Sequence, residues 1–238
     1  MKLGAESPIS SAMAGSIGSL ELKQSRLGWG ALKDPADGDL LAGITAQEQC
    51  WAESLPVFIK KRFLCSRFLV RRWLAQWFDI EPLEIPLKAP PGLPPLLARG
   101  WGEVSWSHSG ERLLLGWSGK PIGVDLERAN RPLAAKALMQ RFFPEIEQAQ
   151  LVHLKGDALQ QAVLRSWVAK EALIKQKRSS IALELSDWCM EYNQSIALHI
   201  PSEISWPVQV SSISFDAELW LVGWTGAMSP PLENFGSS

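Results

Sequence analysis

Two carboxylates stand two positions apart in the segment 121–127, which reads PIGVDLE. Its alternation of apolar and other residues predicts a β-strand, so Asp125 and Glu127 share one strand face with Gly123. Their Cα atoms then lie about 7 Å apart, at roughly 3.3 Å of rise per residue. Two acids beside a glycine suit a hard cation such as Mg²⁺, which binds carboxylates together with phosphate oxygens and water. A half-exposed strand with a solvated acidic face has the same pattern.

A third acid lies on a predicted helix over residues 158–177, where Trp167 and Ile174 belong to an apolar stripe. Glu171 and Lys175 are four residues apart and therefore share a helix face. In a functional interpretation, Glu171 completes a three-carboxylate cation site and Lys175 neutralises a phosphate. The alternative is a surface ion pair, which stabilises a protein by roughly a few tenths of a kcal/mol.

Other candidate phosphate ligands lie upstream. Two strand-like runs, 102–107 and 113–117, predict a hairpin that carries Ser107 and His108 near its turn, where a histidine flanked by hydroxyls can donate to phosphate oxygens or simply face solvent. An earlier basic segment combines arginines, whose forked donors suit phosphate, with buried-type aromatic residues. A solvated basic face is the other interpretation of that segment. Its basic residues are Lys60, Lys61, Arg62, Arg67, Arg71 and Arg72.

The composition restricts the function class. The chain has 238 residues, and 24 Lys and Arg stand against 25 Asp and Glu. This balance argues against nucleic-acid binding, which needs a basic excess. Three widely spaced cysteines and three scattered histidines predict neither a disulfide framework nor a zinc site, and favour a reducing compartment. The hydrophobic fraction of 46% and twelve tryptophans predict a substantial core.

The positioning elements follow from local patterns. Thr45 with Glu48 predicts a capping box at a helix start. The start of the chain lacks the apolar run of a signal peptide, and the sequence has no apolar run long enough to cross a membrane, so we expect a cytoplasmic protein. Further predictions are a loose arm (1–20), a turn (34–39), a helix (55–78), a proline-rich loop (88–95), a helix (132–142) and a strand-like tail (207–224).

An internal repeat suggests how these elements are grouped. Residues 105–119, SWSHSGERLLLGWSG, match residues 212–226, SISFDAELWLVGWTG, at a constant offset of 107 positions. A chance resemblance of two amphipathic hairpins is one explanation. The other is an α+β fold of two similar α/β halves, residues 1–118 and 119–238, packed as a pseudo-dimer with a site between them. The copies differ where chemistry matters, because His108 in the first hairpin corresponds to Phe215 in the second.

The motifs become specific in combination. SWSHS, then IGVDLE, then WVAKEALIK about forty residues later, resemble the 4′-phosphopantetheinyl transferase superfamily. The length and the repeat resemble its longer, surfactin-synthetase-activator type, in which two similar halves form one chain. The resemblance covers about residues 44–185 and is strongest over 105–128 and 142–176.

This resemblance implies a reaction and roles for residues. Such enzymes move the phosphopantetheine arm of coenzyme A onto a serine of an apo acyl or peptidyl carrier protein and release 3′,5′-ADP. Asp125, Glu127 and Glu171 look like the Mg²⁺ ligands, and Glu171, directly or through a water, resembles the base that activates the serine. The residues that resemble coenzyme A contacts are Lys175 and His108, with Lys170 and Ser107 as weaker candidates, and Arg62 and Arg67 towards the 3′-phosphate.

The sequence departs from the family pattern at three places. Val168 follows Trp167 where the family usually has Ser, Thr or Cys. A Gly-Lys-Pro segment of the family is here Gly92-Leu93-Pro94, which removes a lysine. The glycines that normally follow Lys175 are replaced by lysine, arginine and two serines at 177–180. These changes affect the nucleotide end and leave the acidic residues intact; Lys88, Lys177 or Arg178 would be substitutes.

The sequence therefore predicts a Mg²⁺-dependent, monomeric 4′-phosphopantetheinyl transferase that serves an acyl carrier protein of fatty acid, polyketide or peptide synthesis. The acidic recognition helix of such a carrier would suit a basic and apolar rim on this chain. Two rival hypotheses are a non-catalytic module that docks carrier proteins and an unrelated Mg²⁺-dependent nucleotide hydrolase.

Overall fold

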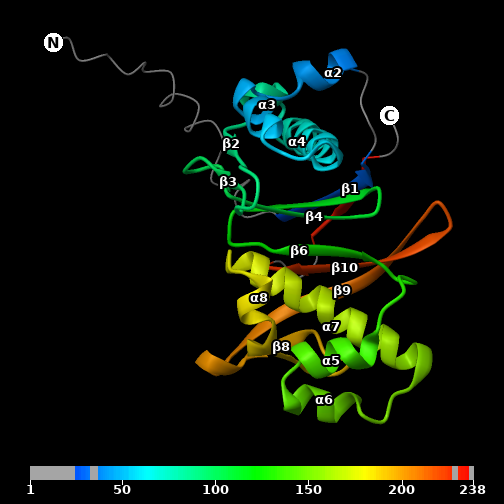
Figure 1. Ribbon diagram of the computed structural model, residues 1–238. Coiled ribbons are helices and arrows are strands. Elements are labelled where there is room, and N and C mark those ends of the chain that lie inside the picture. Colours follow the sequence, from blue (N-terminus) through cyan, green and yellow to red (C-terminus); the bar gives the residue numbers. More distant parts are fainter. Residues whose placement is uncertain (1–24, 33–36, 227–229, 236–238) are drawn as a thin grey trace.

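The protein has a mixed α/β fold in a computed structural model, which describes residues 25–32, 37–226 and 230–235. Figure 1 shows four layers, with helix α4 on one outer side, two β-sheets in the middle and helix α7 on the other outer side. The predicted arm 1–20 lies outside the described residues. So does the first part of the predicted turn 34–39, and its second part belongs to helix α2.

The first sheet is covered by the long helix α4 (Val57–Phe78). Apolar residues of α4, among them Val70, Trp73 and Leu74, pack against Leu113 and Leu115 and stay out of water. The predicted helix 55–78 is thus confirmed, and it begins directly after Pro56, as expected for proline at a helix start. The sheet has the order β11 (Leu232–Asn234), β1 (Ser25–Ala31), β5 (Arg112–Ser118), β4 (Glu103–Ser109), in which only β11 and β1 are parallel.

The second sheet is antiparallel and is covered by the long helix α7 (Gly156–Gln176). Two glycines allow a close approach, because a Cβ on Gly123 would lie 1.8 Å from the carbonyl oxygen of Ala172, and one on Gly223 would lie 2.9 Å from that of Val168. The order is β6 (Val124–Arg128), β10 (Glu218–Thr225), β9 (Ile204–Phe215), β8 (Ile196–His199), β7 (Trp188–Met190).

The two sheets face each other through an apolar layer. Leu27, Trp29 and Leu114 of the first sheet form one cluster with Val124 and Leu126 of the second. At the edge of this layer β4 lies beside β6, near the centre of Figure 1. Strands from distant parts of the chain therefore meet where the predicted acidic residues lie.

The shorter elements complete the fold. The predicted capping box is confirmed, because Thr45 Oγ1 accepts from the Glu48 backbone and the Glu48 carboxylate accepts from the Thr45 backbone. The predicted hairpin, the strand 121–127 and the helices 132–142 and 158–177 are confirmed with shifted ends, as β4–β5, β6, α5 and α7. The remaining elements are α2 (Asp37–Ala42), α3 (Ala46–Glu53), β2 (Leu87–Lys88), β3 (Leu96–Leu97), α5 (Ala135–Phe142), α6 (Glu145–Leu151), α8 (Ile181–Glu184) and 3-10 turns at Pro82–Glu84, Leu185–Asp187 and Ile200–Ser202.

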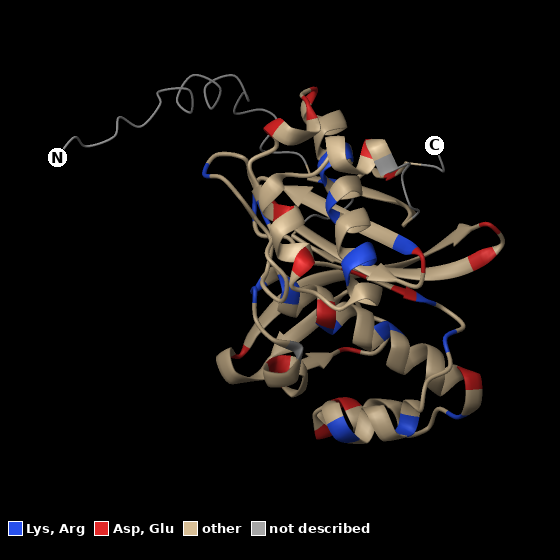
Figure 2. Cartoon of the chain, turned by 45° about the horizontal axis from the view of Figure 1, so that its top comes forward, with Lys and Arg blue, Asp and Glu red and all other residues tan. Residues whose placement is uncertain are grey.

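The surface agrees with the balanced charge. In the view of Figure 2, acidic and basic residues alternate over both sheets and their helices. Across the described ranges, every helix is too short or too polar to span a membrane.

Candidate active site

A row of serines joins strand β4 to strand β6. Ser105, Ser107 and Ser109 occupy alternate positions and therefore share one face of β4. Ser105 Oγ accepts from a backbone N–H of β6 at 3.2 Å, Ser107 Oγ donates to Asp125 Oδ1 at 2.7 Å, and Ser109 Oγ donates to Glu127 Oε2 at 2.8 Å. The row thus fixes both acids of the IGVDLE segment.

Asp125 is the centre of this site. Its side chain is 2% exposed, and Oδ1 accepts from Ser107 and, at 2.7 Å, from Lys175 Nζ. Lys175 Nζ also lies 3.0 Å from Ser107 Oγ and 3.6 Å from Glu171 Oε2. Four of the predicted site residues, Ser107, Asp125, Glu171 and Lys175, are therefore together, and we call them the acid–lysine cluster.

Helix α7 brings its two residues to this cluster for simple reasons. Glu171 and Lys175 are one turn apart and face β6, whereas Ala172 and Leu173 are buried in the core. The missing side chain at Gly123 lets the Ala172 turn sit directly on β6. A helix held this close presents the Glu171 carboxylate beside Asp125.

The cluster shifts the acidity of its members. Burial, and then the neighbouring Asp125, raise the pKa of Glu171 to about 7. Burial lowers the pKa of Lys175, but the attraction of Asp125 and Glu171 outweighs it and the net pKa lies above the ordinary value. At neutral pH Lys175 therefore stays charged, while Glu171 is able to take up and release a proton.

Glu127 lies next to the cluster with partners of its own. Its carboxylate accepts from Ser109 and forms an ion pair with Arg131. Burial raises its pKa, and Ser109 and Arg131 oppose that rise. Glu127 is thus on the same strand face as Asp125, as predicted, but it is held by the connection between β6 and α5.

The residues present fit a hard divalent cation. In the part of the chain that the structure describes, no three His, Cys, Asp or Glu side chains are arranged as a complete metal cluster. Asp125 Oδ2, however, is buried and has no hydrogen-bond partner among the described residues. Mg²⁺ binds one or two carboxylates and takes its other oxygen ligands from substrate phosphates and water. Asp125 and Glu171 meet that requirement, with Glu127 two residues along β6.

A basic pocket of about 230 Å³ opens at one end of the serine row. Lys175, at its inner end, also belongs to the acid–lysine cluster. Arg67 lies in the pocket wall, and burial lowers its pKa to about 10, so it remains charged at neutral pH. The lining consists of Arg67, Pro90, Gly92, Leu93, Pro94, Pro95, Val104, Ser105, Trp106, Lys175, Arg178 and Ser179.

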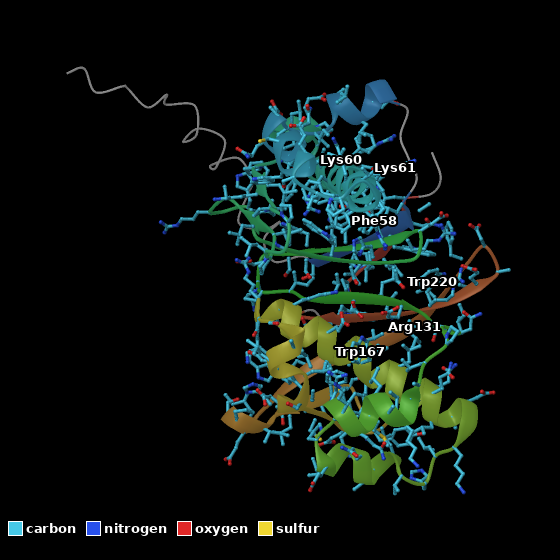
Figure 3. All side chains as sticks on the ribbon, viewed as in Figure 1. Phe58, Lys60, Lys61, Arg131, Trp167 and Trp220 are labelled. Atoms are coloured by element: carbon cyan, nitrogen blue, oxygen red, sulfur yellow. The ribbon has the colours of Figure 1, made fainter. Side chains whose placement is uncertain are left out.

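An open groove of about 580 Å³ lies at the other end of the row, beside Glu127. Arg131 and Trp220, both labelled in Figure 3, belong to its lining. Most of its charges are already paired: Arg112 with Asp216, Arg128 with Glu218, Arg131 with Glu127. The lining consists of Ser109, Gly110, Glu111, Arg112, Glu127, Arg128, Arg131, Asp216, Glu218 and Trp220.

Arg62 and His108 lie at the rim. Arg62 donates to the carbonyl of Gly110 at 3.1 Å, which ties α4 to the β4–β5 turn. Partial burial, and then the charge of Arg62, lower the pKa of His108 to about 4. His108 is therefore neutral at pH 7. Neither residue belongs to the described lining of the basic pocket.

The structure does not bring Lys170 to the cluster. Its side chain is 0% exposed, its Nζ lies 2.7 Å from Glu147 Oε2, and it sits over the ring of Phe143. Burial lowers the pKa of Lys170 and raises that of Glu147, and each residue opposes the shift of the other. In this position Lys170 connects α7 to α6, and it has no access to a ligand in the basic pocket.

Sequence reasoning missed several residues of the site. The motif indicates Ser109 only as a hydroxyl beside His108 and assigns no role to Ser105, although both alternate with Ser107 on the predicted strand. Arg131 was also missed, and it has no motif because its position depends on the connection after β6.

Known proteins are similar to this chain over the same region. The model of the 4′-phosphopantetheinyl transferase superfamily matches residues 121–218. A Synechocystis sp. protein that carries a provisional 4′-phosphopantetheinyl transferase name is 33% identical over 149 residues, 60% of this chain and 59% of that protein. The 4′-phosphopantetheinyl transferase Sfp of Bacillus subtilis is 23% identical over 158 residues, 65% of this chain and 69% of Sfp. The chain thus matches about three fifths of the Synechocystis protein's length.

Proposed function

We propose an activity from the premise that the chain belongs to the 4′-phosphopantetheinyl transferase superfamily. The protein transfers the 4′-phosphopantetheine arm of coenzyme A to a serine of an apo acyl or peptidyl carrier protein and releases 3′,5′-ADP. The observation that carries this proposal is the acid–lysine cluster, in which Lys175 contacts Asp125 beside Glu171 and also lines the basic pocket.

The basic pocket would hold the nucleotide end of coenzyme A. Trp106 and the prolines of its lining offer flat apolar surface to a base, and its cations suit phosphates. The diphosphate then lies at Lys175, where the pocket meets the cluster. Lys175 supplies a fixed positive charge to the phosphate that departs with 3′,5′-ADP.

Asp125 and Glu171, with Glu127 as a third candidate, would hold Mg²⁺. The bound ion supplies charge neutralisation of the diphosphate and of the leaving phosphate. The unpartnered Oδ2 of Asp125 supports this assignment.

Glu171 acts as the base. The serine hydroxyl of the carrier attacks the phosphorus next to the pantetheine arm, and its proton passes to a carboxylate oxygen of Glu171. The new bond joins the serine oxygen to phosphorus, and the bond to the bridging oxygen of 3′,5′-ADP breaks. In the absence of a metal ion, burial and the neighbouring Asp125 raise the pKa of Glu171 to about 7.

The direction of attack assigns a role to the open groove. In an in-line displacement, the attacking and leaving oxygens stand on opposite sides of phosphorus. If 3′,5′-ADP departs into the basic pocket, the serine arrives from the opposite end of the serine row, past Glu127 and Ser109. The groove lined by Arg131 and Trp220 is therefore the proposed approach of the carrier protein.

We also propose that the chain consists of two related halves, 1–118 and 119–238, packed as a pseudo-dimer. Each sheet has a strand, a long helix and a hairpin in the same order: β1, α4, β4–β5 and then β6, α7, β9–β10. Strand β11 returns to the first sheet from the end of the chain. A site that one chain completes by itself supports a monomer. A cytoplasmic location and the absence of a nucleic-acid partner remain part of the proposal.

A transfer assay tests the proposal. Purified apo acyl carrier protein, coenzyme A and Mg²⁺ should give a carrier heavier by one phosphopantetheine arm in the mass spectrum. Asp125→Asn should abolish the transfer, a loss of about 10³-fold or more, without loss of the folded structure. An unchanged carrier mass with several carriers would instead support the non-catalytic docking module, and release of 3′,5′-ADP without any carrier would support the hydrolase.

A further inference from the structure

The basic pocket has an unusual charge composition. Three of its lining residues are the cations Arg67, Lys175 and Arg178, and the described lining contains no acidic residue. A pocket with these properties binds anions. The three cations do not contribute equally, because their partners differ.

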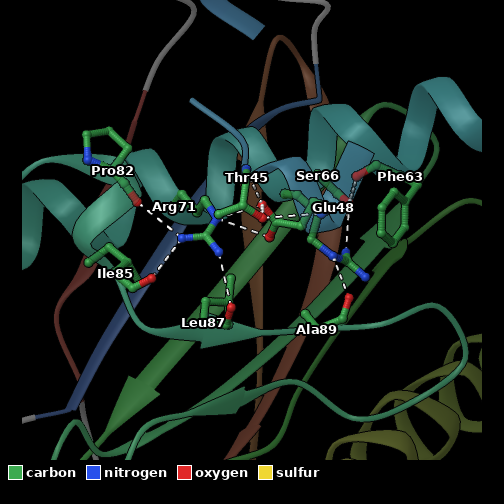
Figure 4. Close-up of polar contacts among 10 residues, drawn as sticks. Thr45, Glu48, Phe63, Ser66, Arg71, Pro82, Ile85, Leu87 and Ala89 are labelled. Atoms are coloured by element: carbon green, nitrogen blue, oxygen red, sulfur yellow. Dashed lines mark hydrogen bonds and ion pairs between the residues drawn. The ribbon is translucent and has the colours of Figure 1, made fainter. Parts of the chain in front are cut away.

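Two of the cations are already engaged. Arg67 Nε donates to the carbonyl of Ala89 at 3.0 Å and an amino group of Arg67 donates to Ser66 Oγ at 3.1 Å, and its guanidinium lies over the rings of Phe63 and Trp106. These contacts, part of which Figure 4 shows, fix Arg67 as a wall of the pocket. Lys175 is held in the acid–lysine cluster and serves the diphosphate.

Arg178 is placed at the pocket by an uncommon backbone conformation. Helix α7 ends in a turn in which Arg178 N–H donates to the carbonyl of Lys175 and Ser179 N–H to that of Ile174. Such a turn needs a left-handed residue, usually glycine, and Arg178 adopts φ 56°. Glycine would adopt this conformation at a lower cost, so the helix end itself does not require an arginine here.

The ion pair of Arg178 leaves it able to bind a ligand. One terminal nitrogen pairs with Glu103, and both side chains are 36% exposed. Exposed pairs of this kind contribute little to stability, and a guanidinium has five N–H donors in a fork that matches a phosphate. Glu103 is not part of the pocket lining and holds the guanidinium at the mouth.

We propose that Arg178 binds a nucleotide phosphate of coenzyme A and of the product 3′,5′-ADP at the mouth of the basic pocket. This inference rests on the proposed function, since it names a residue that binds that substrate. It predicts that the contribution of Arg178 to the affinity depends on the phosphates of the nucleotide and not on its base.

The test measures the binding of 3′,5′-ADP, 5′-AMP and adenosine by isothermal titration calorimetry to the full chain. Arg178→Gly removes the guanidinium and at the same time relieves the left-handed backbone, so its Tm should be equal to or above that of the original protein. The matched control is Lys177→Ala, which removes the adjacent cation; Lys177 pairs with Glu184 and lies outside the pocket lining.

We expect Arg178→Gly to weaken 3′,5′-ADP binding about tenfold and to leave adenosine binding unchanged, and Lys177→Ala to bind both as before. Equal 3′,5′-ADP affinity in Arg178→Gly and the original protein would overturn the proposal, as would an equal loss for adenosine. A transfer assay of the original protein, run in parallel, separates the role of Arg178 from the proposed transferase activity. If the original protein transfers the arm and Arg178→Gly binds 3′,5′-ADP with unchanged affinity, only the role of Arg178 is refuted. An original protein that neither binds 3′,5′-ADP nor modifies a carrier refutes both.

Discussion

The two long helices share a buried ion pair but differ in the residue that follows it. In α4, the buried Arg71 pairs with Glu48 of α3; in α7, the buried Lys170 pairs with Glu147 of α6. In both pairs the glutamate precedes the cation by 23 residues. The next residue differs, because Arg72 is exposed on α4 whereas Glu171 belongs to the acid–lysine cluster on α7.

The strands beside these helices differ in the same way. Asp125 pairs with Gly223 in the second sheet, and the matching glycine of the first sheet, Gly116, pairs with Leu27. Two residues further along each strand, Glu127 of β6 corresponds to Trp29 of β1. The ring of Trp29 contacts Phe215 edge-on. The two sheets therefore share a packing arrangement. The two carboxylates of this strand face, Asp125 and Glu127, belong to the second sheet, and the matching positions of the first sheet are Leu27 and Trp29.

Even the shared ion pair is not the same interaction. Figure 4 shows that Arg71 binds the Glu48 carboxylate and also donates to the backbone carbonyls of Pro82, Ile85 and Leu87. Lys170 has one acidic partner and the ring of Phe143. Glu147 in turn accepts from the Met190 N–H of β7 at 3.1 Å. The first pair thus binds three carbonyls of a connecting segment, while the second joins two helices and one backbone N–H of a strand.

Among the tests of this comparison, we expect the largest effect, a loss of transfer rate, from substituting the residue that follows the buried cation of α7. Glu171→Gln keeps the shape of the side chain but removes the base and a carboxylate charge, so we expect the transfer rate to fall about 10²–10³-fold. Arg72→Gln on the matching turn of α4 is the control and should leave the rate within about twofold. Mass spectrometry of the carrier protein measures both, and equal losses in the two variants would contradict the assignment of the site to α7.

The next largest effect concerns the free energy of unfolding when one partner of a buried ion pair is removed. Removing one partner, as in Lys170→Met or Arg71→Met, leaves a buried carboxylate without a counter-charge and should cost about 3–5 kcal/mol of unfolding free energy. Denaturation in urea measures this loss. It would be contradicted by single variants as stable as the original protein.

Double variants separate the two pairs. Glu147→Leu with Lys170→Met replaces both charges by apolar groups and leaves one buried donor, the Met190 N–H, without its acceptor, so it should recover part of the lost stability. Glu48→Leu with Arg71→Met should recover less, because the carbonyls of Ile85 and Leu87 lose their donor. Equal recovery in both double variants would show that the backbone contacts of Arg71 contribute nothing.

The contrast also explains what the sequence could predict. Apolar patterns located α4, α7 and the hairpin, and the capping box of Thr45 and Glu48 located the start of α3, because those signals are local. The association of Asp125, Glu171 and Lys175 followed from family motifs, and local spacing alone left a solvated strand or helix face open. The position of Lys170 could not be predicted from the sequence. Its side chain points into the core because it pairs there with the buried carboxylate of Glu147, which belongs to another helix.

The contacts of Glu127 were the hardest to predict. Ser109 and Arg131 bind Glu127 from a neighbouring strand and from a connection, and such contacts depend on how β4 and β6 meet. Short elements such as β7 and β8 could not be predicted for a similar reason: their three or four residues have little periodicity, and antiparallel pairing of β7 with β8 and of β8 with β9 stabilises them.

The smallest expected effect concerns the hairpins, where His108 corresponds to Phe215. The folded pKa of His108 is about 4, whereas an unfolded histidine titrates near 6.5. Between these values the unfolded state binds more protons, so stability should fall as pH decreases from about 6.5 towards 4.

His108→Phe makes the two hairpins alike and removes this titration, and His108→Gln removes it without adding an aromatic ring. Relative to the original protein, both variants should gain about 1–2 °C in Tm between pH 7 and pH 5, once solvent screening of the partly exposed ring is allowed for. Thermal unfolding curves at the two pH values measure the change. An equal change in Tm for all three proteins would mean that neither burial nor the charges of Arg62, Lys175 and Arg67 disfavour a proton on His108.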